Sequence, residues 1–460
     1  MPGRNGTPVS PVGTAWASCA SLPPALVLNV DRLTLHHGSL GIIRSLGRMK
    51  VPVFATLSGR LKPAAMSRYL TGSFVWDMDQ LSDERFRDNM AQIGEKLGHK
   101  SVVIPTGDVA AILLAENASF LKRWFIAPNQ EASLPRTLAN KRTLYQLCQR
   151  IAVACPRFDI PTSIDDVKQF ASRTKFPIVI KAAEAWHLRN GRRTTSIATK
   201  LDQLIAAFQE SEQEHASNII LQEFVDSEHG EDWFYHGYRN DESQCQQGFT
   251  GRKLRSYPVF AGPTTLGQSL PNKPLRETAE SLLDALSFRG IVDLDYRFDT
   301  RDGQYKLLDF NPRIGAQFRL FEDCHGNDLA RIQYLDLTSK YETADGPTKS
   351  RTFLVELHDI AASCGYWWRG KLTMRQWWYS LRGSKECAWL SRDDLLPFFM
   401  MCVVTVLRAT NRIFHIKLPR SRAKLRPSPS QTSQAAIAAR ANAHRQSQFP
   451  STSPLLETGS

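Results

Sequence analysis

Hydrophobic and polar residues follow one another along the first part of the chain in a pattern typical of alternating strands and helices. An apolar strand begins at Ala25, and a glycine-bearing turn, a helix and a second strand at Val51–Thr56 follow it. A third apolar strand, Ser101–Asp108, ends in a turn and precedes a helix that runs to about Leu121. Since strands that alternate with helices form open α/β sheets, we predict such a domain over residues 25–132.

The pattern then changes to two helices and a longer series of strands. The helices are predicted at Leu138–Ile151 and Ile164–Arg173. Six strands are predicted at Phe176–Ala183, Asn218–Val225, Trp233–Arg239, Arg252–Phe260, Gly290–Asp299 and Tyr305–Arg313. The tetrapeptide TRDG separates the last two strands and is typical of a hairpin, so we expect them to be antiparallel neighbours. These elements indicate an α+β region over residues 133–345.

The last part of the chain is helical in pattern and rich in tryptophan. We predict a small helical appendix over residues 346–419, with the tryptophans in its core. Its apolar run Leu395–Leu407 has 13 residues, which is too short to span a bilayer. Two interpretations stay open: the run is a buried helix, or the stretch 395–426 makes peripheral contact with an anionic membrane. Residues 1–24 and 420–460 are expected to be disordered, the second as a basic tail.

Length and cysteine usage narrow the class of protein. A chain of 460 residues with 42% hydrophobic residues is long enough for two or three domains with proper cores. Its eight cysteines are scattered without any CxxC motif. This pattern excludes a zinc framework and a disulfide scaffold, and it fits a cytoplasmic protein. The N-terminal segment has no basic region followed by an apolar core, so we expect no secretion signal.

Most of the formal net charge of +13 comes from the end of the chain. After Asp394 the only acid in the sequence is Glu457. Nine basic residues follow Asp394, namely Arg408, Arg412, Lys417, Arg420, Arg422, Lys424, Arg426, Arg440 and Arg445. This segment contributes 9 − 1 = +8, so the body of the chain is only mildly basic. The charge therefore does not require a nucleic-acid-binding surface, and we expect no nucleic-acid partner.

The predicted hairpin brings together side chains that suit a metal ion. Asp309 and Asn311 occupy alternate positions of one strand and so share a face, and Asp295 lies 14 residues upstream on the neighbouring strand. Carboxylate and amide oxygens are the ligands that Mg²⁺ prefers, together with phosphate oxygens of a substrate. Arg313 follows on the same face and is suited to bidentate binding of an anion.

Two lysines extend this set toward phosphate binding. Lys181 ends the apolar strand PIVIK, where a lysine is costly unless an anion meets it, and Lys141 opens a helix. The strand Asn218–Val225 breaks at Asp226, where free backbone groups at an edge would pair with a purine ring. The alternative is that Lys141 is an ordinary surface lysine and that Lys181 extends its amine to solvent.

The sequence resembles the ATP-grasp superfamily of carboxylate–amine and carboxylate–thiol ligases. The resemblance rests on five features in the order found in that family: Lys141, Lys181, the QEFV strand, Asp295 and the motif DFNPR at Asp309–Arg313. The likeness is to an ATP-binding domain of the carbamoyl-phosphate-synthase type, and it covers about residues 134–345. It implies a two-lobed ATP-grasp domain at 133–345, after a pre-ATP-grasp α/β domain at 25–132. The fold class is thus a combination of α/β and α+β.

The resemblance also implies roles for individual residues. The ATP-binding residues would be Lys141, Lys181, Gln222, Glu223, Val225 and Asp232. The ligands of Mg²⁺, or of Mn²⁺, would be Asp295, Asp309 and Asn311. The catalytic residues would be Arg313 and Lys253. Arg313 would stabilise an acyl phosphate or bind the acceptor carboxylate, and Lys253, with Arg252 and Arg255, would reach the γ-phosphate or an acidic substrate. Glu231 is an alternative to Asp232 as the contact of the ribose.

One segment departs from the family pattern. The phosphate-binding loop is normally glycine-rich, whereas residues 184–199 contain one glycine, Gly191, and three arginines, Arg189, Arg192 and Arg193. Either guanidinium groups replace backbone amides there, or the loop binds phosphate weakly.

The activity that the resemblance implies is ligation. ATP would phosphorylate a small-molecule carboxylate, and an amine would attack the acyl phosphate to give an amide, ADP and phosphate. Two alternatives stay open. One is a kinase or phosphotransferase of the same fold, and the other is a nucleotide-binding, membrane-associated module without turnover.

Overall fold

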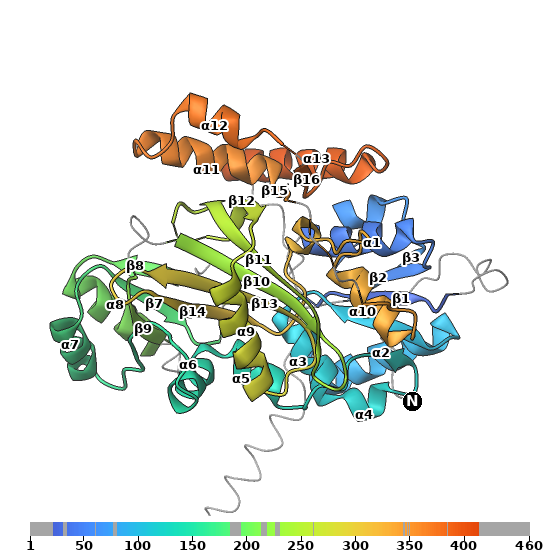
Figure 1. Ribbon diagram of the computed structural model, residues 1–460, viewed down its shortest axis with the longest axis horizontal. Coiled ribbons are helices and arrows are strands. Elements are labelled where there is room, and N and C mark those ends of the chain that lie inside the picture. Colours follow the sequence, from blue (N-terminus) through green and yellow to red (C-terminus); the bar gives the residue numbers. More distant parts are fainter. Residues whose placement is uncertain are drawn as a thin grey trace, which may run out of the picture. The chain divides into compact units, whose positions relative to one another are not determined.

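The computed structural model describes residues 22–30, 35–59, 61–76, 81–184, 195–212, 219–225, 231–260, 262–343, 346, 348, 350–383 and 385–413 (Figure 1). The predicted disordered stretch 420–460, nearly all of 1–24 and most of the loop 184–199 lie outside these residues. Contacts divide the chain into two compact units, Met1–Val403 and Val404–Ser460. The three sheets described below all belong to the first unit.

The first sheet is parallel and has the strand order β3-β2-β1-β4-β5. Its strands are β1 (Ala25–Leu28), β2 (Val53–Leu57), β3 (Gly72–Val75), β4 (Ser101–Pro105) and β5 (Phe125–Ile126). The connecting helices are α1 (His37–Arg48), the 3₁₀ turn η1 (Pro63–Met66), α2 (Asp83–Leu97), α3 (Asp108–Glu116) and α4 (Ala118–Leu121). The alternation of strands and helices that the sequence predicts is therefore confirmed.

Strand β1 shows why both faces of this sheet are covered. Successive side chains of a strand point to opposite faces. Ala25 and Val27 belong to the core that includes α1, whereas Leu26 and Leu28 belong to the core that includes Phe86 of α2. All four residues are buried, as is usual for a parallel sheet between two layers of helices.

The second sheet has four antiparallel strands in the order β6-β9-β7-β8. They are β6 (Phe158–Asp159), β7 (Ile178–Ala182), β8 (Thr195–Ala198) and β9 (Ile219–Glu223). Helices α7 (Ile164–Arg173) and α8 (Leu201–Glu212) share one hydrophobic core with this sheet. Strand β9 lies between β6 and β7, so the strand itself is not a free edge, and residues 226–230 after it lie outside the described residues.

The third sheet has seven strands in the order β14-β13-β10-β11-β12-β15-β16. Its strands are β10 (Glu231–Arg239), β11 (Cys245–Ser256), β12 (Thr264–Ser269), β13 (Gly290–Asp299), β14 (Gln304–Asn311), β15 (Thr352–Leu354) and β16 (Lys385–Cys387). Helix α9 (Lys273–Ala285) packs on β10 and β11, and α5 (Leu134–Ala139) packs on β14 (Figure 1). Helix α6 (Lys141–Arg150) contributes Leu144 and Cys148 to the same core.

Strand β11 differs from its prediction at both ends. It begins at Cys245 rather than at Arg252, and it ends at Ser256, before Tyr257-Pro258, because proline cannot donate to a sheet ladder. The first half escaped prediction because it contains Gly248 and Gly251. A Cβ at Gly251 would lie 2.4 Å from the ring of Phe234, so the packing of the neighbouring strand requires a residue without a side chain there.

The last part of the first unit joins the third sheet. After α10 (Leu329–Leu337), the helices are α11 (Glu356–Trp368), α12 (Met374–Ser380) and the start of α13 (Leu396–Ile413). The segment is mostly helical, and it also supplies β15 and β16, which the sequence prediction did not include. No helix in the described part of the chain is both long enough and apolar enough to cross a membrane.

The predicted burial of the tryptophans is wrong. Trp367, Trp368 and Trp378 are 63%, 88% and 60% exposed, whereas Trp389 is buried. Helix α11 instead buries a smaller and partly polar face made of Asp359, Ala362 and Ser363. The sequence showed the helical period of the segment, but this period did not show which face of α11 packs on the sheet.

The α11 helix is attached to the sheet through a buried ion pair. Arg255 of β11 donates from Nε and Nη2 to the two carboxylate oxygens of Asp359, both at 2.8 Å, and the side chains are 4% and 2% exposed. Thr265 of β12 donates to the same carboxylate at 3.1 Å. Arg255 is therefore a structural residue, and the expectation that it reaches a phosphate is corrected.

Asp359→Ala should lower the free energy of unfolding by about 3–5 kcal/mol, because it leaves the buried guanidinium of Arg255 without its counter-ion. Urea denaturation of the purified protein measures this change. The matched control is Asp165→Ala, which removes an exposed ion pair with Lys168 and should change the unfolding free energy little. Equal effects of the two substitutions would contradict the structural role of Arg255.

Candidate functional site

The β13–β14 hairpin brings the predicted metal-binding side chains together. The two strands are antiparallel neighbours, as the sequence predicts, and their register pairs Asp295 directly with Asp309. The register shifts by one residue next to this pair, at Leu308. Because of this bulge, Leu307 and Phe310 both enter the core although they are three positions apart, while Asp309 and Asn311 occupy the opposite face.

Both predicted lysines reach this hairpin from other elements. Lys141, the first residue of α6, forms an ion pair with Asp309. Lys181 of β7 donates to the hydroxyl of Tyr145 at 2.9 Å and to the backbone carbonyl of Leu308 at 2.8 Å. The interpretation of Lys181 as an amine extended to solvent is therefore wrong, because its amine points into the hairpin.

Lys253 of β11 completes the ring of amines around the two acids. Its Nζ lies 3.4 Å from Oδ1 of Asp295, and the two side chains are 15% and 29% exposed. The neighbouring Arg252 instead lies 2.9 Å from Glu231. Of the three basic residues predicted in this strand, Lys253 is thus the one that the structure places beside the acids.

The predicted adenine and ribose residues lie along β9 and at the start of β10. Gln222 accepts a hydrogen bond from Tyr145 at 3.3 Å, and Glu223 accepts one from the backbone of Arg157 at 2.9 Å. The carbonyl of Val225 accepts from Arg297 at 2.9 Å, and the same guanidinium donates to Asp232 at 2.6 Å. The binding of a nucleotide by the backbone amide of Val225 and by the carboxylate of Asp232 stays a prediction.

Arg313 is fixed by two carboxylates, neither of which sequence reasoning selected. Its Nη1 donates to Asp293 at 2.9 Å, and its Nε lies 3.3 Å from Asp108 at the start of α3. Asp293 also lies 3.1 Å from Nε2 of the buried His236. Arg313 therefore connects the first sheet to the hairpin.

A signal for one missed residue was present in the sequence. Asp293 is two positions before Asp295, so it shares the face of the predicted ligands. The register confirms this, because Asp293 is paired with Asn311, whose amide donates to its carbonyl at 3.2 Å. Tyr145 is one helical turn after Lys141, so it too had a predictable place.

Burial and charge shift the ionisation of these groups in different directions. Burial raises the pKa of Asp295, and Lys253 only partly offsets this. Burial acts in the same way on Asp309, but Lys141 and Lys181 outweigh it and hold the pKa of Asp309 below its usual value. Burial lowers the pKa of Lys181 to about 8, even though Asp309 counteracts it.

The donor set fits a divalent cation only in part. Among the described residues, no group of three or more His, Cys, Asp and Glu side chains is arranged to hold a metal. Two carboxylates and an amide at the hairpin are the oxygen donors that Mg²⁺ and Mn²⁺ accept, and Mg²⁺ usually completes its shell with water and phosphate. A metal would thus fit at this hairpin together with a phosphate ligand.

The charges of the cluster balance. Its acids are Asp108, Asp293, Asp295 and Asp309, and its cations are Lys141, Lys181, Lys253 and Arg313. The sum is 4 − 4 = 0, so the cluster has acids that could hold a cation and amines that could hold an anion. A metal ion bound together with a phosphate would use both kinds of group.

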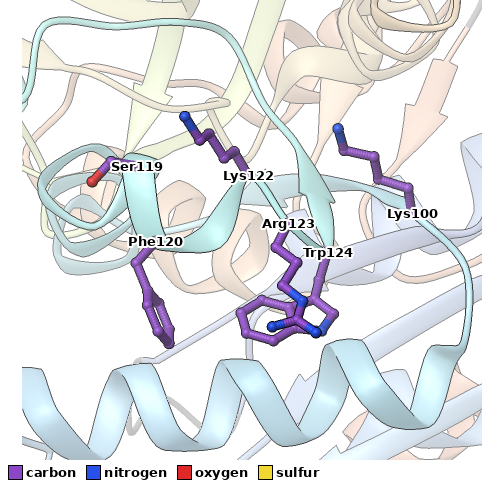
Figure 2. Close-up of a pocket in the computed structure, with 6 residues that line it drawn as sticks. All are labelled: Lys100, Ser119, Phe120, Lys122, Arg123 and Trp124. Atoms are coloured by element: carbon purple, nitrogen blue, oxygen red, sulfur yellow. The ribbon is translucent and has the colours of Figure 1, made fainter.

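A separate pocket lies on the α/β domain. Figure 2 shows its lining residues, which are Lys100, Ser119, Phe120, Lys122, Arg123 and Trp124. The guanidinium of Arg123 lies over the ring of Trp124, 5.2 Å from its centroid. None of the predicted site residues lines this pocket, so it plays no part in the hairpin cluster.

Known proteins share the arrangement of these elements. An L-amino acid ligase from Bacillus licheniformis superposes with a TM-score of 0.53 at 14% identity, covering 72% of this chain and 79% of that one. The biotin carboxylase domain of the Hydrogenobacter thermophilus 2-oxoglutarate carboxylase, solved with Mg-ADP and bicarbonate, superposes at 0.52 and 12% identity, covering 72% and 74%. The chain therefore shares its fold with these two enzymes. This agrees with the fold that the resemblance to the ATP-grasp superfamily implied.

A curated relative adds a more specific likeness. The D-aspartate ligase of Enterococcus faecium (strain Aus0004) is 24% identical over 271 residues, which are 56% of this chain and 62% of the relative. The chain thus spans less than two thirds of that protein's length. No protein-family model matches the sequence.

Lys181 should make the stability of the protein depend on pH in a defined interval. Its amine is protonated in the fold only below about 8, against 10.5 in the unfolded chain, so it opposes folding below 8 and ceases to do so above 10.5. Between these values the unfolding free energy of the wild type should rise by about 3 kcal/mol relative to Lys181→Met.

Chemical denaturation of both proteins at a series of pH values measures this difference. Subtracting the variant's curve removes the contribution of every other titrating group. A constant difference across the interval would contradict a buried, pKa-shifted Lys181.

Proposed function

We propose that the protein is an ATP-dependent carboxylate–amine ligase. The observation that supports this best is the convergence of Lys141, Lys181 and Lys253 on the paired acids Asp295 and Asp309. These five residues come from five different elements, and such a cluster is suited to a polyphosphate and its metal ion.

In this proposal the hairpin and the lysines hold the nucleotide. Asp295, Asp309 and Asn311 would hold Mg²⁺, or Mn²⁺, which supplies charge neutralisation at the transferred phosphoryl group. Lys141 and Lys181 would release their present partners and bind phosphate oxygens, while Lys253 stays beside Asp295. Gln222, Glu223, Val225 and Asp232 would bind the nucleoside, a role that their position along β9 and β10 allows.

The chemistry needs no protein nucleophile. A carboxylate oxygen of the substrate attacks the γ-phosphorus of ATP, the bond to the β-phosphate oxygen breaks, and ADP leaves. The amine nitrogen then attacks the acyl carbon, phosphate leaves, and the nitrogen loses a proton. Arg313 is positioned by Asp293 and Asp108 to stabilise the acyl phosphate or to bind a carboxylate.

The class of substrate follows from the relatives. Two of them are named as ligases of amino acids, the D-aspartate ligase and the L-amino acid ligase. An amino acid is therefore the substrate class that we propose for the carboxylate, the amine or both. A cytoplasmic site of action, with peripheral membrane contact through residues 395–426, remains part of the proposal.

The rival functions differ in what they release. A ligase should release ADP from ATP only when both a carboxylate and an amine are supplied, and phosphate should appear in equal amount. Incubating the full chain with Mg-ATP and pools of D- and L-amino acids, singly and mixed, and measuring ADP and phosphate tests this. A stable phosphorylated product from one substrate would indicate a kinase, and nucleotide binding without turnover would indicate a binding module.

Asp309→Ala combined with Asn311→Ala should abolish Mg-ATP turnover. The loss should exceed the roughly 100-fold that changes in the outer shell of a metal site cost. Asp302→Asn is the matched control, since this acid lies on the turn of the same hairpin and pairs with Lys306 at 3.0 Å. Turnover that survives the double substitution, with unfolding curves unchanged, would refute the metal assignment.

A further inference from the structure

The outer surface of α11, α12 and the start of α13 exposes large apolar side chains to an unusual extent. We call this surface, within residues 356–403, the tryptophan face. Its most exposed members are Ile360, Trp367, Trp368, Met374, Trp378, Tyr379, Leu396, Phe399 and Val403, from 49% to 88% exposed. Contiguous apolar patches of this kind on a folded chain mark sites that contact a membrane or another protein.

The exposure follows the helical period, so it belongs to the folded helices. On α11 the exposed residues Ile360, Cys364 and Trp368 are four apart, opposite the buried Asp359 and Ala362. On α13, Leu396, Phe399 and Val403 are three and four residues apart and so also share one face, opposite the buried Met401. Each of these helices therefore exposes an apolar outer face, while the inner face of α11 is partly polar.

Charge distinguishes between possible partners of this face. The stretch 356–403 that carries this face has six lysines and arginines, all of them exposed, namely Arg369, Lys371, Arg375, Arg382, Lys385 and Arg392. The guanidinium groups of Arg375 and Arg382 lie 5.6 and 4.4 Å from the ring centroid of Tyr379, so charge and aromatic surface are interleaved.

The five acids of the same stretch are all engaged by other groups of the protein. Asp359 and Asp394 are buried with Arg255 and Arg44. Asp393 pairs with Arg48, and Glu386 with Arg319 and Arg351. Glu356 accepts hydrogen bonds from the backbone of Trp389 and Leu390. Each acid is thus engaged by another group, including Asp393, whose side chain stays 40% exposed beside Arg48, and the six basic side chains give the stretch an excess of exposed positive charge.

We propose that the tryptophan face docks on an anionic lipid bilayer. Tryptophan, phenylalanine and leucine beside lysine and arginine are the composition of protein surfaces that lie in the headgroup region of a membrane. A second copy of the same face would bring six cations against six cations, which disfavours a symmetric dimer. Residues 414–460 contain seven lysines and arginines and one acid, so this segment is cationic as well and would be repelled by the tryptophan face.

This proposal goes beyond the ligase activity and does not depend on it. Its test is co-flotation of the full chain with vesicles of equal parts phosphatidylglycerol and phosphatidylcholine, against vesicles of phosphatidylcholine alone. We expect binding to the anionic vesicles and its loss in high salt, since surface charge attraction is screened. The double variant Arg369→Glu, Arg375→Glu should lower the partition coefficient by at least about tenfold, because each basic residue contributes about fivefold.

Tryptophan fluorescence separates this face from the basic tail. The sequence after residue 410 contains no tryptophan, so bromine-labelled lipids can quench only tryptophans of the preceding part. We expect quenching in the wild type and a marked decrease in the variant Trp367→Ala, Trp368→Ala. Leu61→Ala and Lys122→Glu, exposed positions outside the tryptophan face, serve as controls and should bind as the wild type does.

The variants change exposed side chains, so unfolding curves and ATP turnover should stay at wild-type values, and a failure of ligase activity would leave the vesicle result unaffected. Equal binding of the wild type and the two double variants of the tryptophan face, or equal binding of the wild type to both kinds of vesicle, would overturn the proposal. So would the absence of vesicle binding together with a dimer, measured by light scattering, that Trp368→Ala converts to a monomer.

Discussion

The pairing of Asp295 with Asp309 across the β13–β14 hairpin is the constraint on which the rest of the structure depends. Two carboxylates directly opposite each other on one face repel, and burial makes their charges costlier still. The fold compensates by bringing an amine to the pair from α6 and from β7 as well as from β11. Three segments that are far apart in the sequence therefore meet at this hairpin, and their meeting defines the candidate site.

A second set of charges ties the α/β domain to the same place. Arg313 leaves the end of β14 and lies between Asp293 of β13 and Asp108 at the start of α3. Its burial would by itself lower its pKa, but Asp108 and Asp293 raise it, so the guanidinium stays charged. The bulge at Leu308 lets β14 carry these polar groups beside a packed core. Leu307 and Phe310 face the core, while Asp309 and Asn311 lie on the opposite face of the strand.

The hairpin and Lys181 could be predicted from the sequence because each depends on a local pattern of residues. The alternation of Asp309 with Asn311 and the TRDG turn were sufficient to place the hairpin, and the apolar strand PIVIK to place Lys181. Prediction failed where tertiary packing decided the outcome. The first half of β11 contains Gly248 and Gly251, which a strand tolerates there because Tyr235 and Phe234 occupy the space above them. Likewise, nothing local in α11 showed that Asp359 rather than Trp368 would be buried, because the partner Arg255 is 104 residues away.

The burial of Asp359 in place of Trp368 explains how the segment 356–403 is attached to the sheet and still exposes large apolar side chains. If the large aromatics of α11 packed on the sheet, the helix would be held by apolar burial and its outer face would be polar. Here Asp359, Asp394 and Glu386 form ion pairs with arginines of other elements, in addition to the apolar contacts that Trp389 and Met401 make with the core. These arginines neutralise the three acids, whereas Trp367, Trp368 and Trp378 stay exposed. The basic and aromatic residues that remain outside follow from the way in which the inside is held together.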